Sequence, residues 1–176
     1  MCRWIPPPAG EISINCDASV RNDRIGLGCI GRNHIGAVVF AVAAARRNRA
    51  GNSVVFHELE AILRGLQEAL RRGFSAVRVF SDSLISVQIL NGDREADSSC
   101  DHLIFQIAAA ASMLRSFSFS FTYREANSPA DFLSKYCHPD EFEWVFDDSM
   151  IGDYQEEFQY LLCIDAFGMF HLRQPK

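Results

Sequence analysis

The stretch EISINCDAS, residues 11–19, is the segment from which the fold of this chain is best inferred. Apolar residues at positions 12, 14 and 16 alternate with polar residues at positions 13, 15 and 17, and this period of two is typical of a strand with one buried face. Small polar residues follow, where we expect the strand to end. Asp17 is therefore predicted at the edge of a sheet, where a carboxylate is either a solvated surface group or part of a functional site.

The size and composition predict one folded domain. The chain has 176 residues, of which 48% are hydrophobic, and this is enough to bury a full core. Its longest apolar run, residues 35–45, is shorter than the about 20 residues that a helix needs to cross a bilayer, and no secretory signal is recognisable. We expect an intracellular monomer that does not enter a membrane, in either the nucleus or the cytoplasm.

The cysteines do not indicate a metal site. The chain has six of them, and none forms a C-x-x-C pair. Most occupy apolar positions, which predicts buried thiols in a reducing compartment. Cys137 beside His138 does not supply the clustered ligands that zinc requires.

Charge is divided unevenly along the chain. The net charge is -5, yet residues 138–176 hold nine acidic and two basic residues, whereas residues 1–137 hold 13 acidic and 15 basic ones. An acidic balance argues weakly against nucleic-acid binding, but the division indicates a near-neutral core with a separate acidic tail. We therefore divide the chain into an extended, proline-rich lead-in (1–10), a main domain (11–137) and an acidic, aromatic extension (138–176).

The predicted elements of the main domain follow the order βββαβαβα. Strands are predicted at 11–19, 25–30, 37–45, 76–80 and 117–123, and helices at 55–72, 84–90, 100–115 and from 128 onward. Three leading strands followed by alternating helices and strands predict an α/β fold, a mixed sheet flanked by helices. In the extension, residues 141–146 and 154–164 carry aromatic residues among acidic ones, and helical spacing in the second range predicts an appended helix together with short pieces.

Four acidic residues occupy comparable ends of these elements. Asp17 ends the first strand and Asp82 follows the fourth, while Glu58 and Asp131 are expected in the first turns of their helices. Clustered carboxylates raise one another's pKa unless a cation neutralises them, and no Lys or Arg lies at helix or strand spacing beside the first three. Hard oxygen ligands favour Mg²⁺ or Mn²⁺. Two such ions about 4 Å apart position a water and stabilise the leaving oxygen in phosphodiester cleavage.

The chain also resembles the type 1 ribonuclease H family, and most closely the ribonuclease-H-like domain of plant non-LTR retrotransposon reverse transcriptases. The resemblance is carried by four motifs in order: INCDAS (14–19), HELEAILRGL (57–66), VFSDSLISVQILNG (79–92) and REANSPADFLSK (124–135). The lead-in WIPPPAG (4–10) fits that subgroup. The resemblance covers roughly residues 4–137.

The resemblance implies a fold, a site and a substrate. The fold is ribonuclease-H-like, with a five-stranded sheet of order 3-2-1-4-5. The metal-binding and catalytic quartet falls on Asp17, Glu58, Asp82 and Asp131 and would hold two Mg²⁺ or Mn²⁺ ions. The substrate is the RNA strand of an RNA/DNA hybrid, cut to leave a 5′-phosphate and a 3′-hydroxyl.

The chain departs from the family pattern in three places. Ala18 stands where glycine often follows the first aspartate, and the loop 123–129 lacks the histidine of bacterial-type enzymes, so Arg124 or Asn127 is expected to take its place. The basic handle helix of some members is also missing. Because affinity for phosphates comes largely from Lys and Arg contacts, the nearest substitutes are three arginines, Arg46, Arg47 and Arg49, whose alternative role is a solvated loop.

Two other features are interpreted without a functional role. Residues 26–31 satisfy G-x-G-x-x-G, but that fingerprint binds a dinucleotide only where a helix begins within it, and here another extended run follows. His57, beside Glu58, is expected on the surface of its helix.

Three classes of function remain open from the sequence. The leading hypothesis is a metal-dependent endoribonuclease specific for RNA/DNA hybrids. The second is a catalytically weak or inactive module that keeps the fold and binds nucleic acid or protein, with the acidic tail folded over the cleft or docked on a partner. A 3′-5′ exonuclease or strand transferase is less favoured, because those families space their acidic residues differently.

Overall fold

The computed structural model describes residues 3–48, 51–136, 141–147 and 156–166. Its strands are β1 (Ile12–Arg21), β2 (Arg24–Arg32), β3 (Val38–Arg47), β4 (Ala76–Ser81), β5 (Ser116–Phe121) and β6 (Phe142–Phe146). Its helices are α1 (Val54–Arg71), α2 (Leu84–Leu90), α3 (Asp101–Ser112), α4 (Ser128–Ser134) and α5 (Glu156–Ala166), with 3-10 turns at Ser98–Cys100 and Arg124–Asn127. No helix in these ranges has the length and apolar character needed to span a membrane.

The described strands form one mixed sheet in the order β5-β4-β1-β2-β3-β6. β1, β2 and β3 pair antiparallel as a meander, whereas β4 and β5 run parallel to β1. The predicted order 3-2-1-4-5 is confirmed for the first five strands. The sheet is one strand wider than predicted, because residues 142–146, to which no strand was assigned, pair with β3. The unpaired backbone groups on the outer edge of β3 form hydrogen bonds with residues 142–146. The sequence of residues 142–146 did not indicate this pairing.

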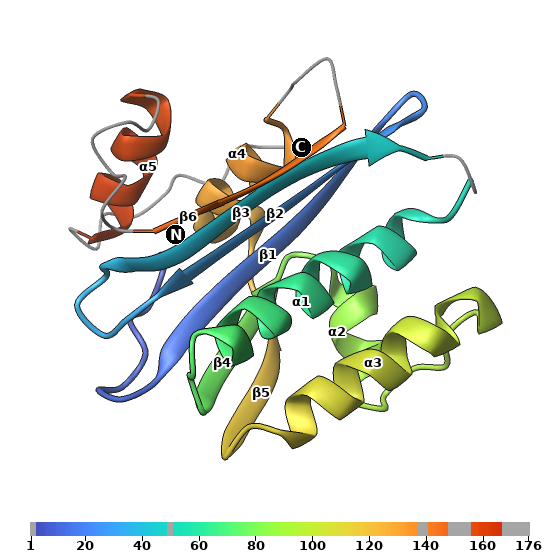
Figure 1. The fold of residues 1–176 in the computed structure, drawn as a ribbon, viewed down its shortest axis with the longest axis horizontal. Helices are drawn as coiled ribbons and strands as arrows, with labels where there is room; N and C mark the ends of the chain where they lie inside the picture. The colour runs from blue at the N-terminus through green and yellow to red at the C-terminus, as the bar shows by residue number, and fades with distance from the viewer. Residues whose placement is uncertain (1–2, 49–50, 137–140, 148–155, 167–176) are drawn as a thin grey trace.

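Helices cover the sheet in two unequal layers (Figure 1). α1, α2 and α3 lie on one face, and α4 and α5 lie on the other. Under α1 and α3 the core includes Ile14, Cys16, Leu59 and Ile107. A smaller cluster under α4 and α5 includes Ile30, Val38, Ala130, Leu133 and Phe158. Because α1 and α4 both pack on β1 from opposite faces of the sheet, side chains from the two helices come close together around this strand.

Two strand glycines allow α4 to approach the sheet closely. A Cβ at Gly28 would lie 2.2 Å from the Ala130 carbonyl oxygen, and one at Gly26 would lie 1.7 Å from that of Ser134. Both distances are shorter than any non-bonded contact, so only glycine fits. This explains the G-x-G part of residues 26–31, which lies inside β2 as predicted and serves helix packing.

Helix α1 begins at a serine cap and carries one unexpected core residue. Ser53 Oγ accepts a hydrogen bond from the Phe56 backbone nitrogen at 3.2 Å, which satisfies one free donor of the first turn. The prediction that His57 lies on the surface is wrong, because the residue is 1% exposed. Its ring packs edge-on against Phe56, and Nδ1 lies 3.1 Å from Glu60 Oε2.

Candidate metal centre

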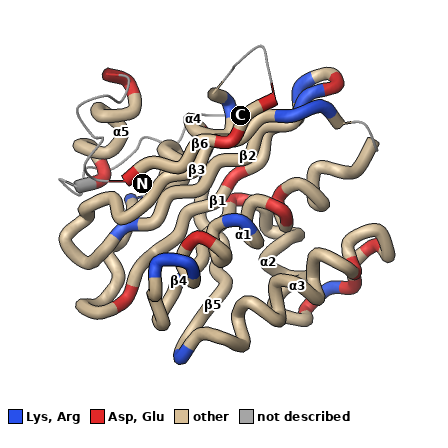
Figure 2. The backbone as a smooth tube through the Cα atoms, in the orientation of Figure 1, with Lys and Arg blue, Asp and Glu red and all other residues tan. Residues whose placement is uncertain are grey.

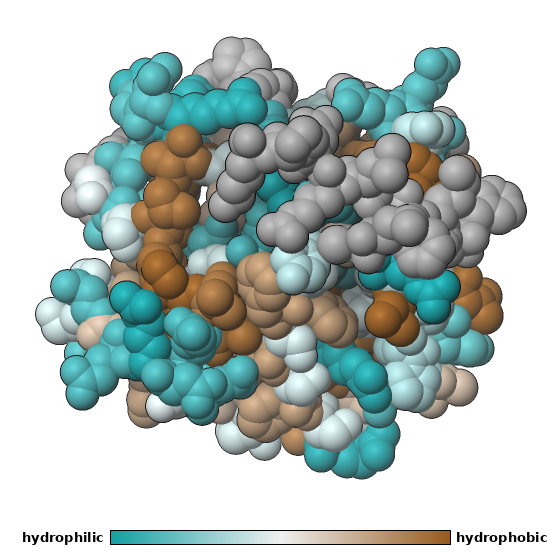
Figure 3. All heavy atoms as spheres, turned by 180° about the vertical axis from the view of Figure 1, so that it is seen from behind, coloured by the Kyte–Doolittle hydropathy of each residue, from teal (hydrophilic) through white to brown (hydrophobic). Residues whose placement is uncertain are grey.

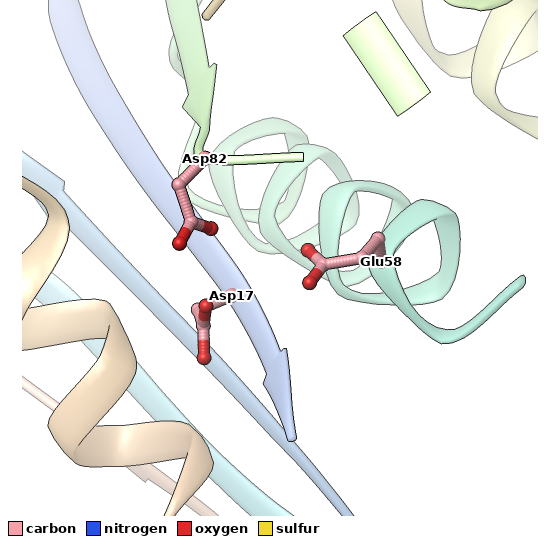
Figure 4. Close-up of side chains that lie close together, drawn as sticks. All are labelled: Asp17, Glu58 and Asp82. Carbon is pink, nitrogen blue, oxygen red and sulfur yellow. The ribbon is translucent and has the colours of Figure 1, made fainter. Parts of the chain in front are cut away.

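Three carboxylates converge at the centre of the sheet. Asp17, Glu58 and Asp82 each offer an oxygen, and these atoms all lie within 4.8 Å of one another. Figure 4 shows the three side chains pointing toward one another from β1, α1 and the end of β4. Asp17 and Glu58 are buried, and Asp82 is partly exposed. The carboxylates therefore line a site that opens on one side.

The strand register explains why two of these residues meet. β1 and β4 are parallel neighbours in which Cys16 pairs with Ser81. The next residue on each chain is an aspartate, so Asp17 and Asp82 lie side by side. Glu58 reaches them from α1, which packs across β1 and β2.

The local positions differ slightly from those predicted. Asp17 was expected at the end of its strand, but β1 continues to Arg21 and Asp17 pairs with Gly28 inside it. The hairpin to β2 extends the ladder past the polar residues that suggested an end. Glu58 was expected in the first turn of its helix, but α1 begins at Val54 and its first turn holds no acidic residue. Both carboxylates are consequently more buried than edge positions would make them.

Burial and mutual repulsion make the site prefer protons or cations. Burial, followed by the charge of Asp82, raises the pKa of Asp17 to about 7. Burial, followed by the charges of Asp17 and Asp82, raises the pKa of Glu58 to about 9. Burial also raises the pKa of Asp82. Within the part of the chain that the structure describes, no Lys or Arg forms an ion pair with any of the three.

Three hydrogen bonds orient the carboxylates. Ser134 Oγ donates to Asp17 Oδ2, and this bond lowers the pKa of Asp17 against the larger opposing effect of burial. Ser81 Oγ donates to Glu58 Oε2 at 3.5 Å, and Asn127 Nδ2 donates to Asp82 Oδ1 at 3.5 Å. Neutral donors are too weak to balance three adjacent negative charges, two of which are buried. The donor set therefore fits a hard divalent cation, which all three carboxylates together could hold.

Asp131, the fourth predicted ligand, lies near this cluster and outside it. It occupies the first turn of α4, as predicted, where Arg124 Nε donates to Oδ1 at 3.0 Å and Lys135 Nζ forms an ion pair with Oδ2. Its charge nevertheless contributes to the raised pKa of Asp17. Asp131 is thus within electrostatic reach of the cluster while paired with two cations of its own.

The residues predicted to contact nucleic acid have different environments. Arg46 pairs with Glu60, and Arg47 Nη1 lies 4.0 Å from an oxygen of the exposed Asp23. Arg49 lies outside the described residues. Arg124 is held by Asp131, as described above. Asn127 is completely buried, and its side chain bonds to Asn15 and to the Cys16 carbonyl, so it is not accessible to nucleic acid in this structure.

Apart from Asn127, the polar residues around the carboxylates had no predicted role. Ser134 lies in the motif at 124–135, Asn15 in the motif at 14–19 and Ser81 in the motif at 79–92. A signal was present for Asn15, because a polar residue between two buried positions of a central strand must find a partner. No spacing signal could have found Ser134, because its contact with Asp17 spans 117 residues.

Comparison with known protein families identifies the family of the chain. A family model described as reverse transcriptase-like matches residues 15–137. The chain belongs to this reverse transcriptase-like family. No curated protein matches the chain.

Solved structures share the fold of this reverse transcriptase-like chain. Ribonuclease H1 from Halobacterium salinarum is similar at a TM-score of 0.65 and 16% identity, over 70% of this chain and 94% of that one. The N-terminal ribonuclease H domain of a Mycobacterium tuberculosis protein gives a TM-score of 0.65 at 23% identity, over 70% and 90%. LC11 ribonuclease H1, solved with an RNA/DNA hybrid, gives 0.63 at 22%, over 69% and 92%. The protein therefore has a ribonuclease-H-like fold.

Proposed function

We propose that this protein is a metal-dependent endoribonuclease that hydrolyses the RNA strand of RNA/DNA hybrids. The observation that carries the proposal is the convergence of Asp17, Glu58 and Asp82, from three separate elements, within 4.8 Å. The pKa of each carboxylate is raised, so ionising all three in the folded chain costs free energy. A bound divalent cation would offset this cost. The complex of a similarly folded ribonuclease H1 with a hybrid supports the substrate class.

The chain's own residues have distinct tasks in this proposal. Asp17, Glu58 and Asp82 would together hold one ion. Asp17 would also contribute to a second ion with Asp131, and the influence of the Asp131 charge on Asp17 supports this assignment. When bound, Mg²⁺ or Mn²⁺ supplies the positive charge that activates water and stabilises the leaving oxygen, so that hydrolysis leaves a 5′-phosphate and a 3′-hydroxyl.

A basic strip beyond the carboxylates supports a nucleic-acid substrate. The register places Arg21 opposite Arg24, and Arg24 opposite Arg47, across three neighbouring strands. Lys and Arg gather at this end of the sheet (Figure 2), and the same corner is hydrophilic when the molecule is seen from behind (Figure 3). Arg21 lies four residues beyond Asp17 on β1, or about 13 Å at the usual rise of a strand. A duplex bound at the carboxylates would therefore reach these cations.

Cleavage of a labelled RNA/DNA hybrid tests the proposal. The wild-type chain with Mg²⁺ should cut the RNA strand internally and leave the DNA strand intact. Asp82→Asn should reduce the rate by at least about 100-fold, the scale of removing one strong electrostatic contact to the reacting groups. Asp93→Asn, an exposed aspartate in the loop after α2, should cut at the wild-type rate. Undiminished cleavage by Asp82→Asn would refute the site.

One observation favours the alternative, a binding module without activity. Arg124 and Lys135 already neutralise the charge of Asp131 through ion pairs. A site that binds no second metal ion would have this arrangement. That function predicts hybrid binding that does not respond to Mg²⁺ and leaves the RNA intact. Gel-shift and cleavage assays on the same samples distinguish the two functions.

The motifs also support a narrower origin. We infer from the lead-in WIPPPAG and from the four ordered motifs that the chain derives from the plant non-LTR retrotransposon subgroup. We also propose, independently of these motifs, that it acts as a monomer. Sedimentation of the full chain with and without hybrid would test the monomer.

A further inference from the structure

A buried chain of hydrogen bonds joins helix α5 to the carboxylate site. Arg32 on β2 is 1% exposed, and its Nη1 donates to Asp165 Oδ2 on α5 at 2.7 Å. Its Nη2 donates to Asn15 Oδ1 on β1 at 3.1 Å. Asn15 Nδ2 donates to Asn127 Oδ1 at 3.0 Å, and Asn127 Nδ2 reaches Asp82 Oδ1 at 3.5 Å. The C-terminal extension is thereby connected to a predicted metal ligand.

Arg32 fixes the orientation of Asn15, and Asn15 together with the Cys16 carbonyl fixes that of Asn127. A guanidinium only donates, so Asn15 must turn its oxygen toward Arg32 and its NH₂ group toward Asn127. Asn127 then accepts with its oxygen and turns its own NH₂ group toward the Cys16 carbonyl, at 2.9 Å, and toward Asp82. With the opposite amide orientation, Asn127 would place its oxygen against a carboxylate. The fixed orientation therefore keeps a donor beside Asp82.

The Arg32–Asp165 pair has no evident value for stability alone. The Asp165 side chain is also buried, and the guanidinium lies 4.0 Å from the centre of the Trp4 ring. Removing two charges from water costs several kcal/mol per ion in proteins, and apolar residues of similar volume often stabilise such positions better. Apolar residues could not replace this pair in full, because they could not donate the hydrogen bond with which Arg32 orients Asn15 and, through it, Asn127.

We propose that Arg32 and Asp165 are positioning residues for the carboxylate site. By orienting Asn15 and Asn127 they hold a hydrogen-bond donor against Asp82, and they make α5 part of the support of the site. This inference rests on the proposed function insofar as Asp82 is taken to bind metal. It assigns the C-terminal extension a task other than covering the cleft or docking a partner.

Arg32→Lys in the full chain tests the inference. Lysine keeps a positive charge beside Asp165, but one nitrogen replaces two that donate in different directions. Calorimetric titration with Mn²⁺ should show affinity about 3- to 10-fold weaker than wild type, near the lower end of the effects of residues that support metal ligands. Ile107→Ala is the control, because Ile107 is a core residue of α3, a helix on the face of the sheet opposite α5. It should lower the melting temperature and leave Mn²⁺ affinity unchanged.

A second variant covers the case in which Arg32→Lys does not fold. Arg32→Met combined with Asp165→Leu removes both charges, so no unpaired buried charge is left. This variant should fold and should also bind Mn²⁺ more weakly, because Asn15 has then lost the donor that orients it and Asn127 is held by the Cys16 carbonyl without that support. Wild-type affinity in either folded variant, or an equal loss in Ile107→Ala, would overturn the inference.

A measurement without metal separates this inference from the proposed function. The side-chain ¹⁵N–¹H signals of Asn127 should shift or broaden in the Arg32 variants and remain in place in Ile107→Ala. If wild type binds no Mn²⁺, the proposed function fails, while these signals still decide whether Arg32 orients Asn127. Identical Asn127 signals in wild type and in a folded Arg32 variant would rule out the positioning role.

Discussion

Replacing Glu58 with glutamine should stabilise the metal-free protein at alkaline pH. The Glu58 side chain is 5% exposed and faces two other carboxylates, and its pKa is raised to about 9 from a usual value of 4.5. Between these two values the folded chain keeps a proton that the unfolded chain releases, so the stability of wild type falls as pH rises. Glutamine mimics the protonated form and has no proton to lose. The advantage of Glu58→Gln should therefore grow with pH.

The magnitude follows from the width of this pH window. Each pH unit within it contributes about 1.4 kcal/mol for one proton. From pH 5 to pH 8 the free energy of unfolding of Glu58→Gln should rise relative to wild type by up to about 4 kcal/mol. In a chain of this size each kcal/mol corresponds to about 2–4 °C in melting temperature. Coupling to Asp17, which titrates near pH 7, makes this figure an upper limit.

Urea unfolding in buffers containing EDTA, at pH 5, 6.5 and 8, provides the assay. Glu60→Gln, two residues along the same helix, is the matched control. Burial opposes ionisation of Glu60, but the hydrogen bond from His57 and the charge of Arg46 prevail and lower its pKa. Its charge therefore contributes stability above the unfolded pKa, and Glu60→Gln should be less stable than wild type at pH 8. The two substitutions on one helix should have opposite signs.

Adding Mn²⁺ should reduce the advantage of Glu58→Gln over wild type. A ligand at 100 times its dissociation constant stabilises the folded state by about 2.7 kcal/mol, and Glu58→Gln has lost one carboxylate that would bind it. The reasoning is refuted if Glu58→Gln is less stable than wild type at pH 8 without metal, or if their difference does not change with pH.

Three further predictions concern the surroundings of the carboxylates. Gly28→Ala should lower the melting temperature and weaken Mn²⁺ binding together, because the new methyl group displaces α4 from the sheet; calorimetry showing wild-type Mn²⁺ affinity would contradict this. Ser134→Ala should raise the pKa of Asp17 and move the pH midpoint of Mn²⁺ binding upward, as followed by titration at several pH values; an unchanged midpoint would show that the hydroxyl does not support the carboxylate. Arg24→Ala with Arg47→Ala should weaken hybrid binding and reduce the slope of log affinity against log salt by about 0.9 for each phosphate that the protein no longer neutralises; fluorescence anisotropy with an unaltered slope would exclude the basic strip.

The sequence alone determined the elements and the residue types of the site. The alternating residues of β1, the three-and-four spacing of α1 and the aspartate after β4 all depend on neighbours in the chain, and such local patterns are readable without a structure. They sufficed to predict the α/β sheet and the four carboxylates, whereas the order of the first five strands was implied by the resemblance to the type 1 ribonuclease H family. That Asp17 and Asp82 are adjacent follows from a parallel pairing that the alternation of strands and helices already indicated.

Only the tertiary structure decided how these residues are held. Residues 142–146 form a strand because the edge of β3 was open to pairing. His57 is a core residue because α1 buries a wider face than the spacing of its apolar residues suggested. Arg32 and Asp165 meet across 133 residues, and the glycines of β2 admit α4 only after the sheet has formed. Contacts between residues so far apart leave no period in the sequence, because they depend on where whole elements pack and not on the spacing along any one of them.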